Sequence, residues 1–107
     1  MGPLFKAALA AAIWVAAGPA SADVNAGRQK AQACAACHGV LGLASMPNTP
    51  HLAGQPEVYL SEQLKAYRSG QRRHEVMTLI AKPLTDAEIA DLSAWFASLK
   101  VEVAEPK

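Results

Sequence analysis

Aromatic residues are scarce in this sequence, at 6% of its 107 residues. A chain of this length forms one compact domain at most, and so few large rings make a self-sufficient core difficult to build. Only two cysteines are present, which excludes a dense disulfide framework. The formal net charge of +1 lacks the basic excess typical of nucleic-acid-binding proteins. Such a composition points to a small domain stabilised by a metal or a cofactor.

The first 22 residues show the three-part pattern of a secretory signal peptide. Lys6 gives a positively charged start, residues 7–17 (AALAAAIWVAA) carry no charge, and Gly18-Pro19 ends that run. Residues 20–22 (Ala-Ser-Ala) form an A-x-A cleavage site. The run is shorter than the about 20 apolar residues that span a bilayer. An uncleaved anchor or a buried alanine-rich helix is the alternative.

We therefore predict a cleaved signal peptide over residues 1–22 and a mature domain over residues 23–107. This predicts export to the periplasm, with no stable membrane insertion after cleavage. Lys6 is the only charged residue of the predicted signal, so the mature chain has a formal net charge of zero.

Three segments predict helices, and no alternating pattern of convincing length predicts a strand. The first covers about residues 25–36, with Asp23 or Asn25 as N-cap. The second begins near Pro56, which suits the first helical position, and ends at Gly70. An all-α fold with three main helices is the prediction.

The third helix has the clearest start, because Thr85 and Glu88 form a T-x-x-E capping box. Residues 39–55 are rich in glycine and proline and predict a long loop. A loop of that length in a small domain is usually functional. Residues 72–83 predict a second loop with one short helical turn, and residues 101–107 predict a frayed tail.

Residues 34–38 read Cys-Ala-Ala-Cys-His, the C-x-x-C-H signature of covalent c-type haem attachment. Two cysteines three positions apart on a helical turn project to the same side, where their thiols can add to the two haem vinyl groups. The adjacent His38 can then place an imidazole nitrogen on the iron. The macrocycle would supply the missing core.

Other interpretations of this motif are weaker. A thioredoxin-like redox pair needs a βαβ context, which the sequence lacks. A zinc site needs four ligands, and only His51 and His74 remain, at no suitable spacing. A disulfide between Cys34 and Cys37 is possible in an oxidising compartment, but it leaves the adjacent histidine unexplained.

The residues alone leave the sixth iron ligand open among Met46, His51, His74 and Met77. A thioether ligand raises the reduction potential of the iron. Met77 reads equally well as a core methionine. His74 lies in a charged run, which favours a solvated polar residue. Met46 and His51 flank the proline-rich loop and can simply pack near the edge of a haem.

Five stretches of the sequence resemble class I c-type cytochromes, in particular single-haem relatives of the periplasmic dihaem cytochromes. They are Cys34 to Gly39, Pro50 to Gln55, Tyr59 to Arg72, Val76-Met77 and Leu84 to Leu99. The resemblance covers nearly the whole mature chain. It implies a small cytochrome c fold wrapped around one covalently bound haem c.

The resemblance also implies roles for individual residues. Cys34 and Cys37 match the thioether attachment sites, and His38 matches the proximal iron ligand. Met77 matches the distal ligand. Pro50 matches the position whose backbone carbonyl accepts a hydrogen bond from the proximal imidazole, which fixes the tautomer of the ring.

Gly27 matches the small residue at which the first helix crosses closely over the last. Its expected partner there is Trp95 or Phe96, and the apolar periodicity of the last helix favours Phe96.

The first functional hypothesis is a one-electron carrier, which is not an enzyme. His/Met ligation would fill both axial positions, and redox partners would dock transiently at the exposed haem edge. A basic rim of Lys65, Arg68, Arg72 and Arg73 could aid docking, although an ordinary solvated helix end is the simpler interpretation. The alternative is a haem subunit of a larger oxidoreductase. A gas sensor or peroxidase would require an open sixth position.

Overall fold

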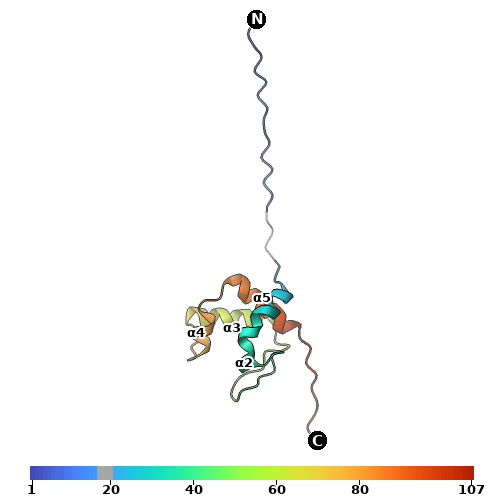
Figure 1. The fold of residues 1–107 in the computed structure, drawn as a ribbon, viewed down its shortest axis with the longest axis vertical. Helices are drawn as coiled ribbons and strands as arrows, with labels where there is room; N and C mark the ends of the chain where they lie inside the picture. The colour runs from blue at the N-terminus through green and yellow to red at the C-terminus, as the bar shows by residue number, and fades with distance from the viewer. Residues whose placement is uncertain (17–20) are drawn as a thin grey trace.

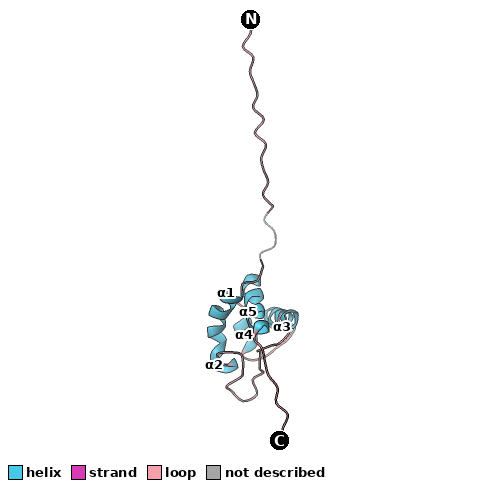
Figure 2. Ribbon diagram, turned by 90° about the vertical axis from the view of Figure 1, so that its right-hand side faces the viewer, coloured by secondary structure: helices cyan, strands magenta, loops and turns pink. Residues whose placement is uncertain are grey.

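The structure is a computed structural model that describes residues 1–16 and 21–107. Its elements are α1 (Val24–Lys30), the 3-10 helix η1 (Ala31–Cys34), α2 (Ala35–His38), α3 (Glu57–Ser69), α4 (Met77–Ala81) and α5 (Asp86–Ser98). Within the described ranges no strand occurs, and Figure 2 shows helices and loops only. The all-α prediction is confirmed.

The helices pack around α5. Helix α1 lies on α5, and α3 packs against both α5 and α4. In Figure 1, α4 is at the left of the helical body, and α2 lies lower down and to the right of α4. The segment that carries the C-x-x-C-H motif and the segment that carries Met77 therefore lie in different parts of the molecule.

The first predicted helix is one helical run over residues 24–38, made of α1, η1 and α2 in succession. Asp23 is its N-cap, because its Oδ1 accepts the N–H groups of Asn25 (2.8 Å) and Ala26 (3.1 Å). Such a cap satisfies donors that have no partner inside the helix. The motif occupies the last turns of this run, in the tighter η1 and in α2.

Helix α1 crosses α5 at Gly27 with no room for a side chain. A Cβ atom at residue 27 would lie 1.9 Å from the carbonyl oxygen of Asp91 and 2.9 Å from Cβ of Trp95. The predicted close crossing is confirmed, with Trp95 as the partner. The preference for Phe96 was wrong, because that ring turns into the core and packs with Leu60.

The start of α5 is fixed by the predicted capping box. Thr85 Oγ1 accepts the N–H of Glu88, and a Glu88 carboxylate oxygen accepts the N–H of Thr85, both at 3.1 Å. Arg68, near the end of α3, donates to the carbonyl of Leu84 (3.0 Å) and pairs with Asp86 (2.6 Å). These bonds tie the end of α3 to the beginning of α5.

The remaining segments also follow the sequence. Helix α3 spans Glu57–Ser69 and ends at Gly70, as predicted. Residues 39–55 contain no helix, and residues 72–83 contain only the short helix α4. Residues 101–107 are exposed and have no regular structure.

Residues 1–16 form neither helix nor strand, and they take no part in the core. Their large apolar side chains are all exposed: Leu4, Phe5, Leu9, Ile13, Trp14 and Val15. The end of the predicted apolar run and part of the cleavage site, residues 17–20, fall outside the described residues. No helix in the described ranges is both long and apolar enough to cross a membrane.

Substitution Gly27→Ala should destabilise the protein by about 2–4 kcal/mol, because the methyl group meets backbone atoms that cannot move without separating α1 from α5. Urea unfolding of the haem-loaded protein measures this. Gln29→Ala, on the exposed side of the same helix, is the control and should cost less than about 0.5 kcal/mol. Equal stability of the two variants would contradict the close crossing.

Glu88 should make the stability of the fold depend on pH. Lys30, 2.5 Å away, and the N–H of Thr85 lower the pKa of the Glu88 carboxyl from 4.5 to about 2. Because the folded pKa is the lower one, this stabilisation is complete above about pH 4.5 and is lost as the pH falls towards 2. In Glu88→Gln the denaturation midpoint should change less with pH between these values than it does in the wild type. Lys30→Gln should show part of this effect. An unchanged pH profile in Glu88→Gln would exclude this contribution.

Candidate functional site

The two cysteines of the motif lie half-buried on adjoining helical turns, and both thiols are free. Burial raises the pKa of the Cys34 thiol, and the positive charge of Lys30 offsets only part of this effect. The thiol is therefore protonated near neutral pH, unlike the activated thiolate of a redox C-x-x-C pair. The βαβ context of such a pair is likewise missing from the described ranges.

His38 ends α2 with its imidazole buried and oriented. Its Nδ1 lies 2.9 Å from the carbonyl oxygen of Pro50, so Nδ1 carries the proton and donates. The lone pair is then on Nε2, which makes no hydrogen bond within the described residues. Gly39 follows in the left-handed region (φ 82°), where a Cβ would lie 1.8 Å from the carbonyl oxygen of Leu43. A backbone turn directly after His38 thus leads into the loop that returns to Pro50.

The loop of residues 39–55 is held against the motif by backbone hydrogen bonds. The N–H of Ser45 donates to the carbonyl of Cys37 (3.2 Å), and the carbonyl of Gly42 accepts the N–H of Leu52 (2.7 Å). These bonds close the loop on itself and on α2. The carbonyl of Pro50 is consequently presented to His38 by a fixed piece of backbone.

The four candidates for the sixth iron ligand have different surroundings. Met77 is the first residue of α4 and is half-buried, whereas Met46 is exposed on the loop. Nδ1 of His51 accepts the N–H of Ala44 at 2.7 Å, which makes His51 part of the loop structure. His74 is exposed, as expected for a solvated residue, but its Nδ1 also accepts backbone N–H groups.

Sequence reasoning missed this capping role of His74. Its partners are Val76 and Met77, two and three residues further on, and Thr78 accepts the N–H of His74 itself. A side-chain acceptor placed just before a short helix is the signal that would have found it.

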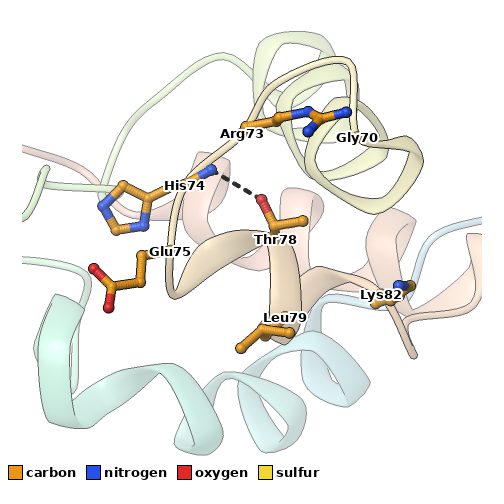
Figure 3. Close-up of a pocket in the computed structure, with 7 residues that line it drawn as sticks. All are labelled: Gly70, Arg73, His74, Glu75, Thr78, Leu79 and Lys82. Atoms are coloured by element: carbon orange, nitrogen blue, oxygen red, sulfur yellow. Dashed lines mark hydrogen bonds between the residues drawn. The ribbon is translucent and has the colours of Figure 1, made fainter.

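The residues around the motif fit a haem. Large apolar side chains lie about half exposed or more on the loop after His38 and on and around α4: Val40, Leu41, Leu43, Met46, Val76, Leu79 and Ile80. In Figure 3, Leu79 points from α4 toward the side on which the first helical run lies. A flat apolar group between the two segments would cover part of this apolar surface and leave the rest at its margin. Among the described residues no cluster of three His, Cys, Asp or Glu offers an alternative metal site.

The fold and the site together define a c-type cytochrome, and comparison with known proteins agrees. The family model for cytochrome c matches residues 24–100. This chain therefore belongs to the cytochrome c family, whose members carry haem c bound covalently through a C-x-x-C-H motif such as residues 34–38.

Three relatives illustrate the similarity. Cytochrome c-554(548) from Halomonas halodenitrificans is 43% identical over 79 residues, which cover 71% of this chain and 95% of that protein. The thiosulfate dehydrogenase electron acceptor from Thiomonas intermedia is 39% identical over 101 residues, or 94% of this chain and 41% of that protein. The crystal structure of cytochrome c4 from Pseudomonas stutzeri superposes with a TM-score of 0.72 at 39% identity, covering 78% of this chain and 48% of that one.

The chain spans less than half the length of the curated proteins named cytochrome c4 that it matches, for example 42% of the one from Pseudomonas aeruginosa. Its likeness to these longer proteins thus concerns one haem domain.

Proposed function

We propose that this protein is a single-haem, one-electron carrier of the periplasm, with His38 and Met77 as axial ligands of the iron. Cys34 and Cys37 are the proposed thioether attachment sites. The observation that carries the proposal is the hydrogen bond from Nδ1 of His38 to Pro50, which leaves the lone pair of the ring on Nε2 in a motif whose two thiols are free. The match over 95% of cytochrome c-554(548) shows that a relative of about this size exists, which supports a single-haem domain here.

Each residue has a defined task in this proposal. The haem, when bound, supplies a one-electron couple between ferrous and ferric iron. The carbonyl of Pro50 fixes the ring of His38 and strengthens its basicity at Nε2. The thioether of Met77 would favour the reduced iron and thereby raise the reduction potential. With two protein ligands in place, neither oxygen nor a substrate would have a free coordination position.

The partner surface we propose is the exposed apolar margin of the site. Leu41, Leu43 and Met46 on the loop are each half exposed or more. A small apolar patch of this kind suits the brief, low-area contacts of redox proteins. Docking there would bring a partner close to the group that carries the electron.

The basic rim expected from the sequence is less suited to docking. Arg68 is committed to the start of α5, and the guanidinium of Arg72 lies 4.7 Å from the ring centroid of Tyr67. Both arginines therefore serve the structure around α3. Lys65 and Arg73 are left as the cations of this region for electrostatic contact.

A subunit of a larger oxidoreductase is the second candidate. The similarity to a thiosulfate dehydrogenase electron acceptor favours it. Gel filtration of a native periplasmic extract distinguishes the two candidate functions. A free carrier elutes at the size of the single chain, and a subunit elutes with its catalytic partner.

We further propose export with cleavage after Ala22. In support, the backbone nitrogen of Asp23 lies 2.7 Å from Oδ1 of Asp91, so a new amino terminus there would be paired with a carboxylate. Intact mass of the periplasmic protein should give a chain that begins at Asp23 and carries one haem. A chain that keeps residues 1–22 would overturn the predicted cleavage.

Carbon monoxide tests the proposed ligation. The reduced wild-type protein should bind it only weakly, because Met77 occupies the sixth position nearly all of the time, and Met77→Ala should bind it readily. Absorption spectra recorded during titration measure this, and haem retained on the denatured chain verifies the thioethers. Met46→Ala is the matched control and should behave as the wild type. Ready binding by the wild type would instead support a sensor or an enzyme.

A further inference from the structure

The helix that begins with Met77 is too short to be stable alone. Helix α4 comprises five residues, Met77–Ala81, and isolated helices shorter than about 12 residues are marginal in water. Its first N–H groups have no acceptor within the helix. Val76, the residue directly before it, provides no side-chain cap. The conformation at Met77 therefore depends on bonds supplied from outside the helix.

His74 supplies those bonds. Its Nδ1 accepts the N–H of Val76 at 3.1 Å and the N–H of Met77 at 3.2 Å. In return, the N–H of His74 donates to Oγ1 of Thr78 at 2.9 Å, and the N–H of Thr78 donates to the carbonyl of His74 at 3.1 Å. Figure 3 shows the bond from His74 to the Thr78 hydroxyl across the first turn of α4. His74 and Thr78 are thus joined by two hydrogen bonds that enclose Met77 in the first turn of α4.

We infer that His74 is a positioning residue for Met77, with Thr78 as its support. The inference rests on the proposed role of Met77 as axial ligand. Nδ1 of His74 fixes the backbone nitrogen of Met77 itself, and the Thr78 hydroxyl fixes the backbone of His74. To accept these two N–H groups, the ring of His74 must keep a lone pair on Nδ1. The backbone N–H groups of Val76 and Met77 occupy this nitrogen. His74 thereby acts on the iron site through Met77.

A matched pair of substitutions isolates the hydrogen bond. His74→Asn keeps an acceptor at the same number of bonds from Cβ, and asparagine is a favoured cap. His74→Ala removes the acceptor. Thr78→Ser and Thr78→Val form the same pair for the hydroxyl. Arg73→Ala, in the same exposed segment, controls for any change of surface. Because these side chains lie outside the buried core, all five variants should fold and take up haem.

Equilibrium binding of carbon monoxide by the reduced holoprotein measures how often Met77 leaves the iron. Apparent affinity rises in proportion to the population with the ligand off. Loss of a side-chain cap typically changes such an equilibrium about fivefold. We expect His74→Ala and Thr78→Val to bind carbon monoxide about fivefold more tightly than the wild type. His74→Asn, Thr78→Ser and Arg73→Ala should stay within about twofold of it.

The same variants in a Met77→Ala background test whether His74 acts through Met77. There the sixth position is already open, so His74→Ala should no longer change the affinity. An effect that persists in this background would overturn the inference, as would His74→Asn behaving like His74→Ala. If Met77→Ala opens the site and His74→Ala does not differ from the wild type, the positioning role fails and the ligation stands. If the wild type binds as tightly as Met77→Ala, the proposed ligation fails, and the inference fails with it.

Discussion

The close crossing of α1 over α5 at Gly27 determines where the reactive side chains of this protein lie. The backbone of Gly27 lies directly against the carbonyl of Asp91 and the side chain of Trp95, with no room for a Cβ between them. The direction of the first helical run is therefore closely fixed. One turn later Lys30 pairs with Glu88 and holds the run on α5 a second time. Residues 34–38 follow directly, and their place relative to the core is a consequence of these two contacts.

The site itself is built mainly from backbone groups that orient side chains. A carbonyl at Pro50 orients the ring of His38, and the N–H groups at the start of α4 meet the ring of His74. Backbone positions in a hydrogen-bonded loop vary less than the ends of long side chains. The two histidines thus have opposite roles, since one ring is held by the backbone and the other ring holds it.

Much of this arrangement was readable from the sequence because the signals are local. The T-x-x-E box at Thr85, the glycine after α3 and the spacing of Cys34, Cys37 and His38 each need only a few neighbouring residues to be interpreted. The choice between Trp95 and Phe96 failed for a physical reason. Adjacent residues on a helix point about 100° apart, so apolar periodicity cannot decide which of two rings faces α1 and which faces the core.

The capping role of His74 could not be predicted in the same way. Histidine is not among the preferred cap residues, and the charged run around it is typical of solvent-exposed chain. Its acceptor function depends on α4 beginning at Met77, and no preferred cap residue marks the start of this five-residue helix. The break of the first helical run into α1, η1 and α2 is also absent from the sequence pattern, since the 3-10 and α conformations differ by only small changes in backbone angles.

The covalent attachment that the C-x-x-C-H motif provides has a consequence for how the protein withstands dilution. A cofactor held reversibly stabilises a fold in proportion to the logarithm of its free concentration, so the benefit disappears when the cofactor is scarce. Two thioether bonds at Cys34 and Cys37 would remove that dependence, because the group then travels with its own chain. The folded state would keep one haem per chain at any protein concentration, even in a compartment that holds no free haem at all.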